Sequence, residues 1–160
     1  MDKVDKNQAV IDFLMQCPLV ASNPVYFNFT EANDNSKSII TEANDKALSK
    51  PFVDGSVMKR YTFTIIDFKS IVDQALPSIL GYTSENVADI MDVQSIMDWI
   101  TEQADNYNYP NFGPNCIVDD MKTATENPNL NGVDTQSRPK LAKYSMAIII
   151  DYLDVSKQIK

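Results

Sequence analysis

The 160-residue sequence predicts a small α+β fold, in which a mixed, mainly antiparallel sheet is flanked by helices. Two segments, 59–68 and 144–153, alternate with the two-residue period of a strand. Between them, apolar residues recur at three- and four-residue spacing up to about residue 104, the period of a helix that packs on a core. A hydrophobic content of 44% and only four glycines fit a single compact domain over residues 1–160.

The N-terminal third is expected to contain a helix, a strand and a long excursion. Helical spacing of apolar residues predicts a helix over 4–15, with Pro18 as its stop. Residues 25–29 alternate well enough for a first strand. The polar stretch 30–56 is expected to be a partly mobile loop that contains a short strand around 38–41 and serves contact or function.

The middle of the chain predicts a strand followed by a long helix. In the strand 59–68, Tyr61, Phe63 and Ile65 share one face. Thr83 or Ser84 is expected to cap the helix by accepting a backbone N–H. The apolar stripe of this helix comprises Ile90, Val93, Met97, Ile100 and Ala104, with Ile96 beside it and Trp99 at its margin.

The C-terminal third is punctuated by prolines and glycines. Pro110 pushes Tyr109 towards an extended conformation, so the preceding helix should end by about Tyr107. Gly113 and Pro114 break the chain again before a strand that starts at 116–118. Residues 125–140 are expected to form a polar loop that orders against a neighbour.

The last strand is expected to be central and covered on both sides, because both of its faces are largely apolar. One face carries Tyr144, Met146, Ile148, Ile150 and Tyr152, and the other carries Ser145, Ala147, Ile149, Asp151 and Leu153.

The net charge of −8 and the pI near 4.4 argue against a surface that grips the phosphate backbone of nucleic acid. They are compatible with a pore through which DNA passes, because an acidic lining would repel phosphates. If the chain forms such a pore, some of Asp67, Glu85, Asp119, Asp120 and Asp134 are the candidates to line it, and the alternative is that these acids only maintain solubility.

The absence of certain residue types and motifs excludes several classes of catalytic, metal-binding and nucleotide-binding site. The chain has no histidine, which removes Ser-His-Asp and Cys-His catalysis and histidine-bearing zinc sites. Its four glycines are isolated, so neither the dinucleotide fingerprint nor the phosphate-binding loop is present. We therefore expect no catalytic residue, no cofactor and no metal.

Three remaining patterns are better explained by structure than by chemistry. Ser56 and Lys59 have the Ser-x-x-Lys spacing of penicillin-binding proteins but lack its companion elements, so a loop edge that enters a strand is expected. Asp119 and Asp120 are adjacent in a strand and should point to opposite faces, which prevents them from sharing one metal. The aromatic residues Trp99, Tyr107, Tyr109 and Phe112 have no interleaved basic residues, which favours core packing or a subunit contact over base stacking.

The two cysteines and the N-terminal sequence give information on the cellular compartment of the protein. Cys17 and Cys116 have no metal-ligand spacing and are expected to be reduced thiols, although a disulfide remains an alternative. No stretch approaches the ~20 apolar residues of a membrane span, and residues 1–5 do not resemble a signal peptide. The chain is expected to stay in the compartment where it is made, without contact with a membrane.

Three motifs from Lys59 to the end of the chain occur in a characteristic order. They are the helix end Asp-Trp-Ile-Thr-Glu-Gln at 98–103, the turn Tyr-Pro-Asn-Phe-Gly at 109–113, and the loop Pro-Asn-Leu-Asn-Gly-Val at 128–133 that leads to Leu-Ala-Lys-Tyr at 141–144. In this order the sequence resembles the tail terminator proteins of long-tailed bacteriophages, the family often labelled "minor capsid protein" in phages of Gram-positive hosts. The excursion over 30–56 departs from the family pattern.

The resemblance implies a structural virion protein and not an enzyme. It implies a homo-hexameric ring in the tail or neck of the virion, made in the host cytoplasm, that caps the tail tube and ends its polymerisation. The expected partners are further copies of the chain, the tail tube protein, and the head-tail connector or stopper protein, with DNA only passing through the channel. The candidate interaction residues are Tyr109, Phe112, Leu130, Asp134 and Tyr144. Two alternatives stay open: another neck protein, such as a connector or stopper, or a cytosolic enzyme that uses carboxylates or a metal.

Overall fold

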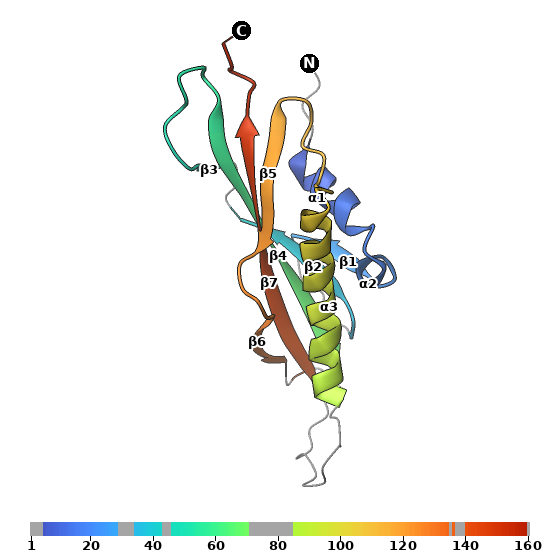
Figure 1. The fold of residues 1–160 in the computed structure, drawn as a ribbon. Coiled ribbons are helices and arrows are strands. Elements are labelled where there is room, and N and C mark those ends of the chain that lie inside the picture. The colour runs from blue at the N-terminus through green and yellow to red at the C-terminus, as the bar shows by residue number, and fades with distance from the viewer. Residues whose placement is uncertain are drawn as a thin grey trace.

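The computed structural model describes residues 5–28, 34–42, 46–70, 85–134, 136 and 140–159. Two 14-residue strands form the centre of the sheet, β4 (Val57–Ser70) and β7 (Leu141–Asp154). They pair antiparallel over their whole length. At about 3.3 Å per residue each strand is roughly 46 Å long, and together they run along the molecule (Figure 1).

Shorter strands complete the sheet on both sides of this central pair. β2 (Lys37–Thr41) and β3 (Lys46–Ala47) follow one another along the free side of β4. β5 (Cys116–Thr123) and β6 (Asn129–Asp134) follow one another along the free side of β7. β1 (Val25–Phe27) pairs parallel with β2. The order β1-β2-β4-β7-β5, with β3 on β4 and β6 on β7, confirms the predicted mixed, mainly antiparallel sheet.

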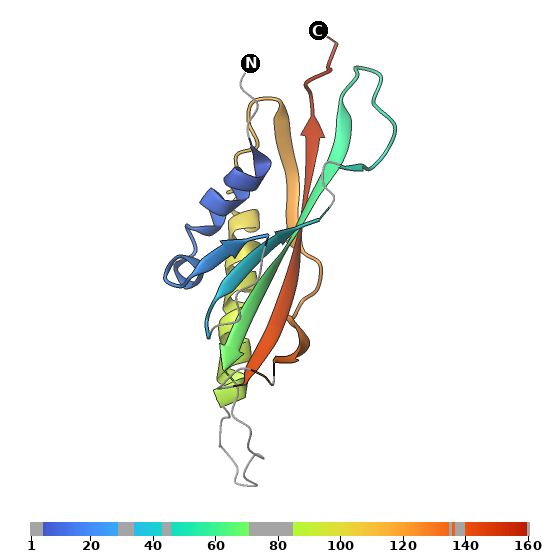
Figure 2. The same cartoon turned by 180° about the vertical axis from the view of Figure 1, so that it is seen from behind.

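The described helices are α1 (Lys6–Leu14), α2 (Pro18–Ala21) and α3 (Glu85–Asp105), and they lie on one face of the sheet (Figures 1 and 2). α1 lies within its predicted range, and the Asp5 carboxylate caps it by accepting from the backbone N–H of Asn7 at 2.9 Å. Pro18 was expected only to end this helix. It also starts α2, because its fixed φ suits the first helical position and its missing N–H costs nothing there.

α3 confirms the predicted apolar stripe and ends at Asp105, before the 109–113 turn. Its proposed caps, Thr83 and Ser84, lie outside the described residues. The buried members of the stripe are Val93, Ile96, Met97 and Ile100.

The core lies between the helices and the facing side of β4 and β7. This side carries Tyr61, Phe63 and Ile65 of β4, and Tyr144, Met146, Ile148, Ile150 and Tyr152 of β7. Each set shares one face as predicted, and all of these side chains are buried. On the other side of β7, Ala147, Ile149, Asp151 and Leu153 are only partly buried. β7 is therefore central, but the prediction that layers cover both of its faces is wrong for the described part of the chain, because all three helices pack on one side. A small second cluster of Ile66, Phe68 and Leu141 lies apart from the main core.

Two segments expected to be loops contain strands. The 30–56 excursion includes β2, as predicted around 38–41, and also β3, while 125–140 includes β6. The reason lies in the length of β4 and β7, whose backbone groups need partners along both free sides. Polar side chains do not prevent this pairing, and Ser36, Lys37 and Ser38 are buried.

Candidate functional site

Two of the five candidate interaction residues belong to the core. Phe112 is 4% exposed, and its ring centroid lies 5.5 Å from that of Tyr61 and 5.4 Å from that of Tyr152. Tyr144 is 6% exposed and lies opposite Asp67 of β4. Neither side chain is available to a partner, so their assignment as contact residues is corrected. An aromatic residue in a turn was taken as a surface contact, whereas here it fills space between sheet and helices.

The other three candidates lie nearer the surface. Tyr109 is partly buried and borders a groove beside α1. Leu130 is 57% exposed in β6. Asp134 ends β6, but its side chain lies outside what the structure describes.

Three of the four aromatic residues singled out in the sequence belong to the main core, in which Phe112 is buried and against which Trp99 and Tyr109 pack. Trp99 packs on Phe13 of α1 with ring centroids 5.1 Å apart, and Tyr107 packs edge-on against Tyr109 at 6.4 Å. Phe112 lies in the core. The interpretation as core packing is confirmed for Phe112, Trp99 and Tyr109, whereas Tyr107 is 81% exposed.

The candidate catalytic and acidic residues are engaged elsewhere. The Ser56 hydroxyl donates to Asp54 at 2.6 Å, whereas the Lys59 ammonium pairs with Asp154 at 2.8 Å, so the two do not form a Ser-Lys pair. Asp67 is buried in an ion pair and cannot line a channel.

The second pair of acids lies at an irregularity in the sheet. The register of β5 shifts between Val118 and Asp120, so the regular alternation expected for Asp119 and Asp120 is interrupted by a bulge. Among the described residues, no group of three or more His, Cys, Asp or Glu side chains could hold a metal ion.

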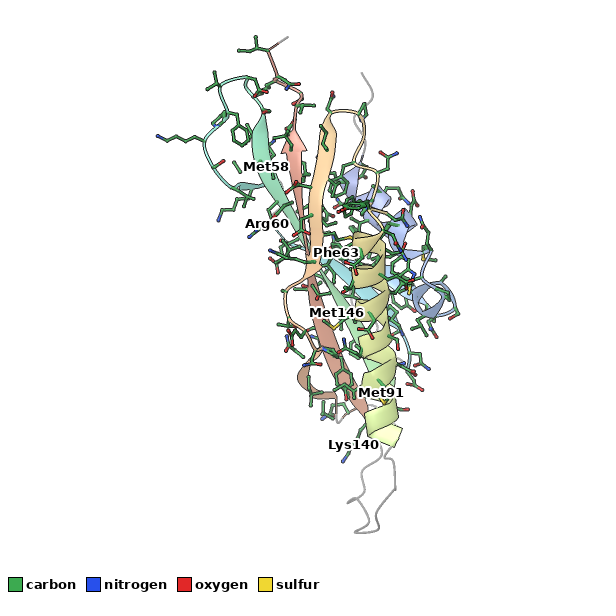
Figure 3. All side chains as sticks on the ribbon, viewed as in Figure 1. Met58, Arg60, Phe63, Met91, Lys140 and Met146 are labelled. Carbon is green, nitrogen blue, oxygen red and sulfur yellow. The ribbon has the colours of Figure 1, made fainter. Side chains whose placement is uncertain are left out.

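A projecting arm is the feature that sequence reasoning missed. We define the arm as residues 46–60, which include β3 and the start of β4, together with the C-terminal segment 151–159 beside them. It extends past the helices at one end of the sheet (Figures 1 and 2), and Met58 and Arg60 mark its base in Figure 3. At its tip Phe52 is 51% exposed and Val53 is fully exposed. Leu48 and Ile159, also on the arm, are exposed too.

Hydrogen bonds hold the tip in a fixed shape. The Asp54 carboxylate accepts from the Ser56 N–H at 3.0 Å, the Ser56 hydroxyl at 2.6 Å and the Gln158 amide at 2.8 Å. These bonds, led by the Ser56 hydroxyl, lower the pKa of Asp54 to about 2. Gly55 has φ +89°, and a Cβ there would lie 2.4 Å from the Lys157 carbonyl oxygen, so the turn requires glycine.

Ion pairs hold the base of the arm. The Arg60 guanidinium makes two bonds to the Asp151 carboxylate, at 2.8 and 3.1 Å. Desolvation raises the pKa of Asp154, but hydrogen bonds from Lys59 and Ser156 outweigh it and lower the pKa to about 2. The carboxylates of the arm are thus all engaged.

The arm is cationic as well as apolar at its surface. Lys46, Lys50 and Lys157 are exposed, and none of them makes an ion pair with a described residue. The arm contains five basic and three acidic residues, so its net charge is positive. Asp54 keeps its own negative charge at the tip, because its hydrogen-bond partners are neutral.

The helical face has the opposite charge. Residues 5–22 and 85–115, which comprise the three helices and the turn after α3, contain eight Asp or Glu and one lysine. That lysine, Lys6, lies over the Tyr152 ring at 5.4 Å. α3 has no basic residue in its last turn, where Glu102 and Asp105 lie instead.

Two neighbouring grooves open on this helical face. The α1 groove, of about 380 Å³, lies between α1 and the turn at 109–111, and its lining residues are Asp5, Gln8, Ala9, Asp12, Phe13, Gln16, Tyr109, Pro110 and Asn111. The α3 groove, of about 340 Å³, is lined by Cys17, Pro18, Leu19, Ser95, Asp98, Trp99 and Glu102. The Phe13 and Trp99 rings, which contact each other at a tilt of 46°, lie between them. Among the residues that the structure describes, each groove is lined by apolar side chains and two carboxylates, with no basic residue.

No protein-family model matches the chain, and no curated protein matches it either. None of the described helices combines the length and the apolar character that crossing a membrane requires.

The charges and shapes of these surfaces are suited to binding other proteins. The molecule presents a cationic, apolar projection and, separately, an acidic face with apolar grooves. Two such unlike surfaces are suited to protein–protein contact, because charge complementarity orients the partners and apolar burial holds them.

Proposed function

We propose that this chain is a structural protein of a bacteriophage virion, of the tail terminator type, that forms a ring on the end of the tail tube. The ring would stop tube polymerisation and present a surface to the head-side connector or stopper protein. DNA would pass through its channel, and no cofactor or catalytic residue is needed for this role.

The projecting arm is the observation that carries the proposal. Its tip exposes Phe52 and Val53, while hydrogen bonds through Asp54 keep the turn ordered. A fixed loop with large apolar side chains in solvent has a cost in an isolated chain, and such surfaces mark sites of protein contact. The order of motifs from Lys59 onwards supports the same role, as does the small α+β fold.

The outer edge of β5 supports contact through the arm in preference to strand pairing. A bulge at Asp119 and the charged residues Asp120 and Lys122 lie along this strand. Bulges and charges on an edge strand discourage pairing with another sheet. The tip of the arm is a turn and not an edge strand, so these features of an edge do not bear on contact through Phe52 and Val53.

Imaging tests this proposal. The full chain is to be tagged at its C-terminus, purified with the particles that contain it, and located by gold labelling in electron micrographs. We expect label at one end of each tail tube, and a closed ring in averaged end views. Label spread along the tube with no terminal ring would contradict a terminator, and label on the connector alone would favour the neck-protein alternative.

A further inference from the structure

We propose that the arm of one copy inserts its tip, Phe52 and Val53, into the α1 groove of a second copy of the same chain. This inference rests on the self-assembly in the proposed function and names the two surfaces that meet.

Charge complementarity selects a second copy as the occupant. The α1 groove carries Asp5 and Asp12, both exposed, and no basic side chain is among its described lining residues. The tip is flanked by Lys50, which makes no ion pair with a described residue, and Lys46 lies nearby on β3. A chain with a net charge of −8 repels its own copies in general, so a cationic arm and an acidic helical face favour orientations in which these two surfaces meet.

The apolar parts of the two surfaces also match. Ala9, Phe13, Tyr109 and Pro110 provide apolar contact in the groove, and its volume of about 380 Å³ lies in the range of ~300–1,000 Å³ typical of binding clefts. Aromatic anchors that enter a pocket dominate the binding free energy of many interfaces. Phe52 is such an anchor, because half of its side chain is exposed in the single copy.

The positions of the two surfaces make the contact intermolecular. At one end of the molecule the loop after β3 lies on one side and α1 lies on the other, and the opposite views agree on this (Figures 1 and 2). The arm of a chain therefore points away from its own α1 groove. A contact between two unlike surfaces is head-to-tail, and repeated head-to-tail contacts produce a ring when the rotation closes.

Photo-crosslinking from the tip tests the contact directly. Phe52 is to be replaced by p-benzoylphenylalanine in the full chain, and equal amounts of ¹⁵N-labelled and unlabelled protein are to be mixed at high concentration and irradiated. We expect mixed-isotope crosslinks to peptides that contain residues 5–16 or 109–111. The same crosslinker at Leu130, which is 57% exposed on β6, is the control and should not give these products.

Crosslinks within one copy only, an absence of crosslinks, or crosslinks mainly to another surface such as the α3 groove would overturn the inference. Crosslinks to an added partner protein in place of a second copy would overturn it as well.

Mixing two variants tests the head-to-tail arrangement. K50E damages the arm and leaves the groove intact, whereas D12K damages the groove and leaves the arm intact. Each variant alone should associate at least about tenfold more weakly than the parent chain, and their equimolar mixture should form pairs through the one intact arm and the one intact groove. K122E makes the same charge change at an exposed lysine on β5 and should leave association unchanged.

Association is to be measured by light scattering after size-exclusion chromatography, with thermal unfolding of each variant as a check on folding. Parent-like association of both variants, or a mixture that behaves like each variant alone, would contradict the arrangement. A ring that forms on tube ends without arm crosslinks would overturn this inference and leave the proposed function standing. Arm-to-groove crosslinks without a ring on tube ends would support this inference and contradict the proposed function.

Discussion

Lys37 and Asp67 lie directly opposite each other on β2 and β4, and their side chains form an ion pair with an Nζ–Oδ1 distance of 2.9 Å. The two side chains are 2% and 1% exposed. Desolvation by burial lowers the pKa of Lys37 and raises the pKa of Asp67, and the attraction between the two opposes both shifts. The Asp67 Oδ2 atom accepts no hydrogen bond from a described residue. Burial of each charge costs free energy, and the attraction between Lys37 and Asp67 offsets part of this cost. Removal of either side chain therefore leaves the other charge buried without compensation.

We predict that D67N destabilises the chain by about 3–5 kcal/mol, because it leaves the Lys37 ammonium buried without its counter-charge. The double variant K37M/D67L should be close to the parent chain, since a buried ion pair can be replaced by apolar residues at little cost. Urea unfolding of the parent and the two variants measures this.

R60M is the matched control, because it removes a more exposed ion pair from the same strand and should cost no more than about 1 kcal/mol. Equal stability of D67N and the parent chain would show that Lys37 does not depend on Asp67.

Acid should loosen the arm. The folded chain holds the pKa of Asp54 and of Asp154 at about 2, below the ordinary value of 3.8. A depressed carboxyl pKa stabilises the fold above the ordinary value, and this stabilisation is lost as the pH falls towards the folded pKa. The arm contacts should therefore weaken between about pH 4 and pH 2.

Two backbone amides report on the ionisation of these carboxylates. The Ser56 N–H donates to Asp54 with an N–O distance of 3.0 Å, and the Ser156 N–H donates to Asp154 with an N–O distance of 2.9 Å. Their NMR shifts should titrate with midpoints near pH 2. D54N should remove the transition at Ser56 and keep the one at Ser156, whereas a midpoint near 4 at either amide would rule out the hydrogen bond there.

Burial separates two residues that the sequence grouped as contacts. F112A should cost about 3–5 kcal/mol in the free energy of unfolding, because it removes a ring packed between Tyr61 and Tyr152. L130A removes an exposed side chain and should change the free energy by no more than about 0.5 kcal/mol. Chemical unfolding of the isolated chain measures both, and similar effects of the two substitutions would contradict the burial of Phe112.

The regular elements could be predicted because their signal is local. α3 and the two central strands carry apolar residues at the period of their own structure, and Tyr61, Phe63 and Ile65 share one face as predicted. β3 and β6 were missed because polar residues fill them and only the length of β4 and β7 requires them. The burial of Lys37 depends on a carboxylate 30 residues away, which no local pattern shows.

The candidate site was harder to predict than the fold. Phe52 and Val53 interrupt a polar stretch, and an apolar pair in such a stretch usually anchors a loop to a core. Their exposure follows from a turn held by Asp54, Gly55 and the distant C-terminal segment. The α1 groove could not be predicted either, because α1 and the 109–111 turn are far apart in the chain. Of its lining residues, only Tyr109 was among the candidate interaction residues.

The last turn of α3 offers a test of whether the acidic face is maintained at the expense of stability. Glu102 and Asp105 lie where the helix dipole is negative, and no basic residue is present in this turn. D105K should therefore stabilise the isolated chain by about 1 kcal/mol, because it removes an unfavourable charge and adds a favourable one.

D98K makes the same change in net charge further from the helix end, and it also removes the hydrogen bond that Asp98 accepts from Gln94 at 3.1 Å. The difference in melting temperature between the two variants therefore combines the effect of the dipole with the loss of this exposed bond. If D105K is more stable than D98K and assembles less well than the parent chain, the acidic turn serves assembly at a cost in stability. If D105K melts at or below the temperature of D98K, the carboxylates of this turn do not strain the helix, and the acidic face has no measurable cost in the isolated chain.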